Sequence, residues 1–235
     1  MGAIEAAAQT VTVQAGGCRF ELQPERAAWL PEPGLLLVAD VHLGKAQSFR
    51  RLGVPVPGGT TLGNLARLDR LIGRTRPRRL VFLGDLLHAR AARAPAVLTA
   101  VAAWRRRHAG LAMTLVRGNH DDRAGDPPPD WAIEVVDEPW IAGPLALCHE
   151  PQAVDGRYVV AGHVHPAFVV GRGVDAMRLP CFHFGPAAAV LPAFGEFTGM
   201  HRVPGRPGDR VFVVGEGRVH EVPVRPEGAA PTLES

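Results

Sequence analysis

The chain repeats one pattern five times: a run of apolar, β-type residues that ends in side chains able to bind a metal ion. A short continuous apolar run is typical of a strand that is buried on both faces of a sheet. The carboxyl ends of parallel strands lie along one edge of a sheet, so side chains from distant segments would meet there. The five clusters are Asp40-Val41-His42, Gly84-Asp85-Leu86-Leu87-His88, Gly118-Asn119-His120-Asp121, Cys148-His149-Glu150 and Gly162-His163-Val164-His165.

The length and composition favour one α/β domain over two small ones. With 235 residues, 46% of them hydrophobic, the chain can bury a full core. We expect a single domain over residues 1–225 and a disordered tail over residues 226–235, which lack an apolar pattern. Because no apolar run approaches about 18 residues, we expect no membrane span and a cytoplasmic protein.

The cysteines and the charge balance are weaker constraints. Cys18, Cys148 and Cys181 are odd in number and unpatterned, which suits reduced packing residues rather than a disulfide framework. The net charge is +3 and the isoelectric point is about 9.1. These values are compatible with a polyanionic partner and with many other partners.

The first half of the chain predicts a hairpin, a short strand and then three buried strands. The hairpin is expected at Val11–Leu22 around a Gly-Gly turn, and the short strand at Ala27–Leu30. The three buried strands are expected at residues 35–39, 80–83 and 111–116. Each of these three leads directly into one metal-ligand cluster.

Two helices are expected between these buried strands. Apolar residues recur at helical spacing from Thr60, which we expect to cap its helix, to Gly73. A second helix is expected to begin at Pro95 and to continue through Trp104. The resulting β-α-β-α-β order implies parallel strands joined by right-handed crossovers.

The second half predicts short strands separated by glycine and proline, with no long helix. We therefore expect a mostly antiparallel second sheet. Two sheets facing each other with helices outside would form an α/β fold of the four-layer α/β/β/α sandwich type, with two mixed sheets. The expected strands are residues 133–136, 141–147, 158–161, 168–170 and 211–214.

The spacing of the donors predicts a shared site for two ions. Asp40 and His42 are two residues apart, so at an extended strand end they point the same way and can hold one ion. Asp85 follows Gly84, where the backbone can turn sharply, and its two carboxylate oxygens make it the natural bridge between two ions. The remaining donors are the amide of Asn119 and the imidazoles of His149, His163 and His165.

This donor set contains oxygen and nitrogen without thiolate. It suits two divalent metal ions, with Mn²⁺ as the first expectation and Fe or Zn²⁺ as alternatives. Two such ions, the carboxylates of Asp40 and Asp85 and a bridging hydroxide leave a net positive charge, which favours an anionic phosphate ester. Ions about 3.5–4 Å apart can activate the hydroxide and hold the phosphoryl oxygens during in-line displacement.

Together, the clusters resemble the signature of the calcineurin-like metallophosphoesterase superfamily over residues 35–170. The resemblance implies that His120 is a non-ligand acid that stabilises or protonates the leaving oxygen, and that Asp121 orients its imidazole. It also implies two ligand sets. The first metal would be held by Asp40, His42, Asp85 and His165, and the second by Asp85, Asn119, His149 and His163.

A narrower resemblance lies in the segments 41–46, 49–58 and 163–166. These are similar to the bacterial ligase-associated DNA damage response endonucleases, also called PdeM proteins. Relatives of that group are associated with an ATP-dependent DNA ligase, a helicase and an exonuclease. The resemblance implies a DNA endonuclease or phosphodiesterase that acts in DNA repair.

Candidate substrate contacts are basic or imidazole side chains near the strand ends. Lys45, Arg50 and Arg51 lie in a segment from Gly44 to Gly59 that is too long for an ordinary connection, so we expect a functional loop. The alternative is a solvated loop with ordinary surface charges. Arg117 and His88 complete the candidates, which are therefore His88, Lys45, Arg50, Arg51 and Arg117; the superfamily often carries Asp or Arg where this chain has His88.

Two other functions stay open at this point. One is a small-molecule phosphatase or cyclic-nucleotide phosphodiesterase with the same metals, and the other is a non-catalytic scaffold, which the presence of His120 and all ligands disfavours. We expect DNA or another phosphodiester as substrate, no membrane partner, and a homodimer that covers exposed hairpin edges. The arginine runs at 74–79 and 105–107 are expected at the edge opposite the metals.

Overall fold

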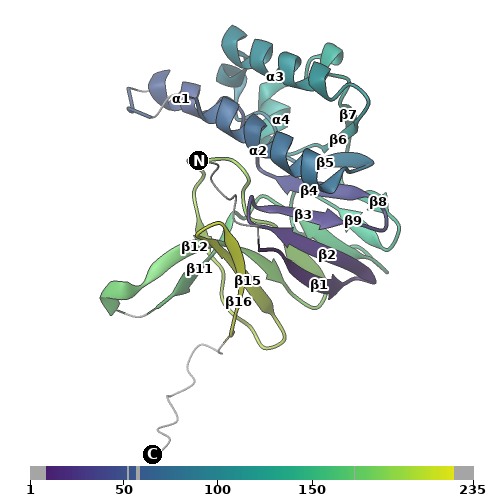
Figure 1. Ribbon diagram of the computed structural model, residues 1–235, viewed down its shortest axis with the longest axis vertical. Helices are drawn as coiled ribbons and strands as arrows, with labels where there is room; N and C mark the ends of the chain where they lie inside the picture. The colour runs from purple at the N-terminus through teal and green to yellow at the C-terminus, as the bar shows by residue number, and fades with distance from the viewer. Residues whose placement is uncertain (1–8, 52, 57–58, 172, 225–235) are drawn as a thin grey trace, which may run out of the picture.

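The computed structural model describes residues 9–51, 53–56, 59–171 and 173–224, and shows two β-sheets packed face to face with helices on one side (Figure 1). The expected disordered tail at 226–235 lies outside the described residues. Among the described helices, none combines the length and the hydropathy that crossing a bilayer requires.

The first sheet has seven strands in chain order, from β1 to β7. Strands β1 to β4 pair antiparallel and β4 to β7 pair parallel, so the predicted β-α-β-α-β unit is confirmed. The predicted hairpin is also confirmed, because Gly16 and Gly17, both at positive φ, connect β1 to β2. The bounds are β1 Val11–Ala15, β2 Cys18–Gln23, β3 Ala27–Leu30, β4 Leu35–Ala39, β5 Arg79–Leu83, β6 Ala112–Val116 and β7 Glu134–Val136.

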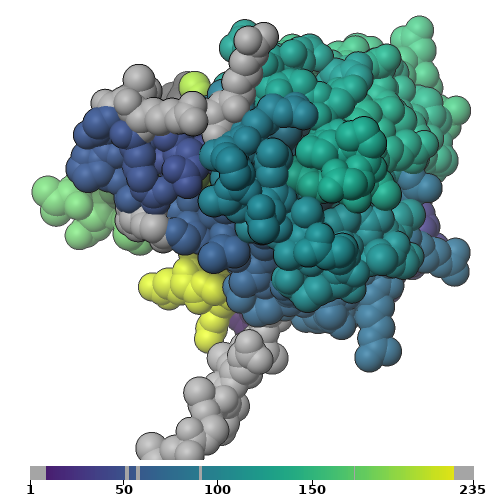
Figure 2. Space-filling model, turned by 90° about the horizontal axis from the view of Figure 1, so that it is seen from above, coloured from purple at the N-terminus to yellow at the C-terminus, as the bar shows by residue number. Residues whose placement is uncertain are grey.

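Helices cover the outer face of this sheet, where Leu68, Trp104 and neighbouring apolar side chains pack on Phe82. The blue and teal segments of Figure 2 show this helical face from above. The α-helices are α1 Lys45–Arg51, α2 Thr60–Thr75, α3 Pro95–Arg107 and α4 Asn119–Ala124, and the 3₁₀ helices are η1 Arg90–Arg93, η2 Pro129–Trp131 and η3 Gly173–Asp175.

Three details of the helical layer differ from the prediction. The cap of α2 is Gly59 rather than Thr60, and no side chain accepts its first N–H groups. This helix continues past Gly73 to Thr75, because Arg76 takes the left-handed conformation that ends it. Helix α1 occupies the start of the segment that was expected to be a loop.

Most strand pairs of the second sheet are antiparallel, as predicted: β8 with β9, β11 with β12, β12 with β13 and with β15, and β15 with β16. A parallel group that was not predicted lies among them, where β10 pairs with both β9 and β13, and β11 also pairs parallel with β14. The chain between β9 and β10 crosses the outer face of the sheet and returns to its starting edge, which makes the two strands parallel. The bounds are β8 Trp140–Ala142, β9 Leu145–Leu147, β10 Tyr158–Ala161, β11 Pro166–Val170, β12 Met177–Phe184, β13 Ala188–Val190, β14 His201–Arg202, β15 Arg210–Gly215 and β16 Arg218–Val222.

The predicted pair of mixed sheets is confirmed, with one change in the outer layer. The inner faces share a core in which the ring of Phe184 makes edge-to-face contacts with those of Phe20 and Phe212. The distances between ring centres are 5.5 Å and 5.7 Å, respectively. On the outer face of the second sheet, Val154 packs on Ala146 and neighbouring residues. Within the described residues, the connection between β9 and β10 thus takes the place of the expected fourth, helical layer.

Candidate metal centre

All seven candidate metal ligands lie at one edge of the two sheets. Asp40 follows β4, Asp85 follows β5, and Asn119 begins α4 just after β6. His149 follows β9, and His163 and His165 follow β10. The five segments therefore bring their polar side chains together, as parallel strands that end at a common edge must do.

The first group of donors consists of Asp40, His42 and His165. The Nε2 atoms of the two imidazoles are 3.3 Å apart, and Nε2 of His165 is 3.5 Å from Oδ1 of Asp40. Nδ1 of His165 donates to the carbonyl of Gly199, so its Nε2 is free to bind an ion. Asp40 is fully buried and its Oδ1 has no hydrogen-bond partner, an arrangement that a cation would satisfy.

The second group consists of Asn119, His149 and His163. Nε2 of His149 is 3.1 Å from Oδ1 of Asn119 and 3.0 Å from Nδ1 of His163. Nδ1 of His149 donates to the carbonyl of Leu83, which leaves Nε2 as the atom that faces the other donors. Three lone-pair donors thus point at one another, an arrangement that a cation between them would satisfy.

Asp85 lies between the two groups. Its Oδ1 is 3.4 Å from Nε2 of His149, and its Oδ2 is 3.8 Å from Nε2 of His42. Burial raises the pKa of Asp85, while the nearby charge of His149 opposes this shift. Burial also holds the pKa of His42 far below its ordinary value, and the charge of Lys45 lowers it further. A neutral imidazole beside a carboxylate is the state that binds a metal.

The backbone at this edge adopts a conformation that non-glycine residues rarely take. Five of the seven candidate ligands have positive φ, between 47° and 65°. Such residues concentrate at functional sites, where the surrounding structure holds them in place. They are Asp40, His42, Asp85, His163 and His165.

Three glycines leave the space that the ligands occupy. A Cβ on Gly84 would lie 2.0 Å from Nδ1 of His149, and one on Gly118 would lie 2.5 Å from Oδ1 of Asp85. A Cβ on Gly162 would lie 2.7 Å from Oδ2 of Asp40. The glycine in each of these clusters therefore has a steric reason, because any larger residue would displace a ligand.

The donor set fits divalent metal ions. Two triads, Asp40 with His42 and His165, and Asp40 with Asp85 and His149, each bring their ligand atoms within 4.8 Å of one another. The triads contain oxygen and nitrogen only, the donors that Mn²⁺, Fe and Zn²⁺ accept. Together with the unpartnered Oδ1 of Asp40, this geometry supports two adjoining ion positions joined by Asp85.

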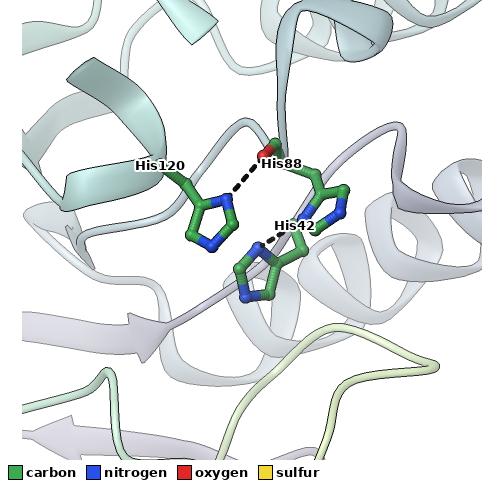
Figure 3. Close-up of side chains that lie close together, drawn as sticks. All are labelled: His42, His88 and His120. Carbon is green, nitrogen blue, oxygen red and sulfur yellow. Dashed lines mark hydrogen bonds between the residues drawn. The ribbon is translucent and has the colours of Figure 1, made fainter. Parts of the chain in front are cut away.

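Two further histidines, His88 and His120, cluster with His42 of the first group (Figure 3). Nδ1 of His120 donates to the backbone carbonyl of His88 at 2.7 Å, so Nε2 of His120 points into the site, 3.9 Å from Oδ2 of Asp85. The ring of His88 stacks on that of His120 and lies 3.3 Å, between Nδ1 atoms, from His42. Burial, with the charge of Lys45, lowers the pKa of His88 to about 4, so this ring is neutral near pH 7.

The prediction that Asp121 orients the imidazole of His120 is wrong. Oδ1 of Asp121 accepts a hydrogen bond from the N–H of Leu87, and Oδ2 accepts one from the N–H of Gly118, both at 3.1 Å. Asp121 is fully buried and fastens two ligand-bearing turns to each other. The sequence placed it next to His120, but a helical neighbour points its side chain elsewhere, and the carbonyl of His88 does the orienting instead.

The candidate substrate residues near α1 differ in placement. Lys45 begins α1 and lies close enough to His42 and His88 for its charge to lower the pKa of both. Arg50 lines a cavity of about 170 Å³ between α1, α2 and α3, and its guanidinium donates to the carbonyl of Val56. Arg51 ends α1, and its side chain lies outside the described part of the structure. Phosphate binding by these residues stays a prediction.

Arg117 lies beside the second group but is already paired. Its guanidinium donates to Asp126 at 3.1 Å and to Asp137 at 2.7 Å. A cavity of about 320 Å³ here is lined by Arg117, by two candidate ligands and by four acidic side chains. We call these four residues the acidic rim: Asp122, Asp137, Glu138 and Glu150. Sequence reasoning missed the rim, because its members come from three separate segments with no common motif.

The arginine runs far from the site have structural partners. Arg74 pairs with Glu25, and Arg107 pairs with Asp69. Arg105 is buried and donates to backbone carbonyls that include those of Trp131 and Leu111. These side chains lie at the ends of α2 and α3, at the strand edge opposite the candidate metal centre, as predicted.

Comparison with known proteins finds one family model, described as calcineurin-like phosphoesterase, over residues 34–149. The crystal structure of the Pseudomonas putida nuclease MPE is similar at 44% sequence identity and a TM-score of 0.82. That likeness covers 91% of this chain and 100% of the P. putida chain. Yfce, a phosphoesterase from E. coli, shows 16% identity and a TM-score of 0.41 over 81% of this chain and 99% of its own. No curated protein matches.

Proposed function

The chain belongs to the calcineurin-like phosphoesterase family and is a metal-dependent phosphoesterase, and from this premise we propose that it is a binuclear nuclease that cleaves DNA. The observation that carries the proposal is Asp85, whose two oxygens face the two donor groups. The P. putida nuclease, similar over nearly the whole chain, supports a nucleic acid as the substrate.

We propose the same ligand sets that the resemblance implied. The first ion would be held by Asp40, His42, Asp85 and His165, and the second by Asp85, Asn119, His149 and His163. When bound, two divalent ions supply a polarised water nucleophile and neutralise charge on the phosphoryl oxygens. Mn²⁺ is the first proposed metal, with Fe or Zn²⁺ as alternatives, because all three accept oxygen and imidazole nitrogen donors.

His120 would assist the departure of the leaving oxygen. Its Nδ1 proton is engaged by the carbonyl of His88, so its tautomer and ring orientation are fixed. Nε2 faces the site, and because Nδ1–H is already bonded to a carbonyl, the ring would donate from Nε2 to the leaving oxygen as an imidazolium that carries a proton on both nitrogens. Lys45, whose charge reaches both His42 and His88, would attract a substrate phosphate on the same side. The remaining substrate candidates are proposals of the same kind.

The biological setting is part of the proposal. The sequence segments shared with ligase-associated DNA damage response endonucleases support a cytoplasmic role in DNA repair, linked to an ATP-dependent DNA ligase, a helicase and an exonuclease. We also propose a homodimer. The proposed role in DNA repair and the proposed homodimer do not depend on each other.

The test compares substrates on one preparation whose metal content has been measured. Mn²⁺-loaded enzyme is assayed on plasmid, single-stranded DNA, bis(p-nitrophenyl) phosphate, p-nitrophenyl phosphate and 2′,3′-cyclic AMP. We expect cleavage of DNA and of the diester, both abolished by Asp85→Asn and both retained by Asp155→Asn, a matched change of an exposed carboxylate outside the acidic rim. DNA left intact while small esters are hydrolysed would refute the nuclease proposal.

One observation favours a second candidate, a small-molecule phosphodiesterase. The acidic rim borders the second donor group, and its four carboxylates exceed the single charge of Arg117. Such a rim repels a polyanion and tolerates a small ester. The substrate comparison above separates the two candidates directly.

A further inference from the structure

A segment between β13 and β14 spans the candidate metal centre from one donor to another. We call residues 193–201 the strap. At one end, the N–H of Gly195 donates to the carbonyl of Asp40 at 3.0 Å. At the other end, the carbonyl of Gly199 accepts from Nδ1 of His165 at 3.2 Å, and the N–H of His201 donates to the carbonyl of His165 at 3.0 Å. The strap therefore touches two proposed ligands of the first ion.

The strap is also fastened from the helical side. Arg67 donates to the carbonyl of Phe194 at 2.7 Å, and its guanidinium lies 4.1 Å from the centre of that ring. Arg26 donates to the carbonyl of Ala193 at 3.3 Å. At Gly195, a Cβ would lie 2.4 Å from the carbonyl oxygen of Val41, so the backbones are in direct contact. These contacts fix the path of the strap.

Within this fixed path, Phe197 has two unfavourable features, a strained backbone and an apolar side chain exposed to solvent. Its φ is 59°, a conformation in which a bulky residue is an outlier. Its side chain is 45% exposed, and within the described residues its ring makes no aromatic or cation contact. A fold that only needed to close this loop would be served better by glycine or by a polar residue. Strain and exposure coincide here on a segment that touches two proposed ligands, and this coincidence points to a substrate group that covers the ring.

The place of Phe197 along the strap indicates which group this is. Phe197 is two residues from Gly199, so at about 3.3–3.6 Å per residue its Cα lies within about 7 Å of the residue that holds His165. A group bonded to the scissile phosphate would reach that distance. Every nucleobase has a flat face that can stack on an aromatic ring, so this contact does not depend on which base is present.

We propose that Phe197 is a specificity-determining residue on which the nucleobase next to the scissile phosphodiester stacks. The proposal rests on the proposed function, because it requires a nucleotide substrate. Phe197 acts in binding the substrate and takes no part in the transfer of protons. Its loss therefore raises KM and leaves kcat nearly unchanged.

The test uses two chromogenic esters that share a leaving group. Thymidine 5′-(p-nitrophenyl phosphate) carries a base, and methyl p-nitrophenyl phosphate does not. For Phe197→Ala we expect KM of the thymidine ester to rise about 5- to 150-fold, the range for the loss of one stacked base, with kcat within twofold. KM of the methyl ester stays unchanged, and Phe197→Trp restores binding of the thymidine ester. Ile141→Ala, also at a side chain that is 45% exposed, leaves both esters unaffected.

A binding measurement supplies an independent result. Metal-free enzyme is titrated into fluorescently labelled oligothymidylate and into an abasic oligomer of equal length. Phe197→Ala is expected to weaken binding of the oligothymidylate and to leave binding of the abasic oligomer unchanged. The inference is overturned if the variant binds oligothymidylate as tightly as the wild type. It is also overturned if kcat/KM falls equally for both esters, which would indicate damage to His165 through the strap. If wild-type enzyme leaves DNA intact, but ester kinetics and oligomer binding still distinguish Phe197→Ala from the wild type as expected, the nuclease proposal is refuted and the stacking proposal is retained.

Discussion

Replacing Gly84 by alanine tests the second ion position with a calculable displacement. The new Cβ would lie 2.0 Å from Nδ1 and 2.4 Å from Cγ of His149, whereas ordinary contact begins at about 3.4 Å. The imidazole must therefore move by roughly 1.4 Å, and coordination distances tolerate only about 0.2 Å. The movement also breaks the hydrogen bond between Nδ1 and the carbonyl of Leu83. We expect the second ion to bind at least about 100-fold more weakly.

Gly143→Ala is the matched control. Gly143 also has positive φ, 60° against 73° for Gly84, but a Cβ there would meet nothing within 4 Å. Both substitutions place alanine in the left-handed region, which costs about 1–2 kcal/mol. Gly84→Ala adds the overpacking of a buried site, about 1–3 kcal/mol. The expected losses in free energy of unfolding are about 1–2 kcal/mol for the control and about 2–5 kcal/mol for Gly84→Ala.

The assay combines urea denaturation of metal-free protein with calorimetric titration of Mn²⁺ and measurement of kcat. The control is expected to bind two ions and to keep its activity, and Gly84→Ala is expected to keep one ion and to lose turnover. If Gly84→Ala binds two ions with the affinity of the wild type, the assignment of His149 as a ligand is refuted.

Three further predictions address other parts of the molecule. His120→Ala should retain both ions by elemental analysis and lose about 10²- to 10⁴-fold in kcat, and an unchanged kcat would overturn its role as acid. The double change Asp122→Asn and Glu150→Gln in the acidic rim should raise kcat/KM on DNA about two- to fivefold at low salt, because repulsion of the backbone falls; a gain that persists at high salt would contradict this reason. Burial raises the pKa of Cys148 to about 11 and that of Cys181 to about 12, so neither thiol should react with a disulfide reagent in native protein at pH 8, and rapid reaction of either would show that it is not buried as described.

The convergence of the candidate ligands was predictable because their signal is local. Each donor comes directly after an apolar strand, and the parallel order that follows from β-α-β connections places the strand ends together. The roles of Asp121 and Arg117 were not predictable in the same way. Asp121 accepts from the N–H of Gly118, three residues away, but its other bond is to the N–H of Leu87, 34 residues away. Arg117 donates to the carboxylates of Asp126 and Asp137, 9 and 20 residues away.

The same limit applies to the second sheet and to the strap. The parallel group β9-β10-β13 depends on how the chain crosses the sheet between strands, and short strands of three or four residues carry too little periodicity to reveal direction. Phe197 lies in an irregular segment, where the sequence shows an aromatic residue but not its positive φ or its exposure.

The five left-handed residues at the metal edge give the molecule an uneven distribution of stability. If the proposed ions bind, new bonds would offset the strain of Asp40, His42, Asp85, His163 and His165; without ions, that compensation would be lost. The β-sheet core, whose side chains pack independently of the ions, is unaffected. Loss of metal would therefore loosen the turns at one edge while the sandwich behind them remains folded, so that demetallation and unfolding are separate events.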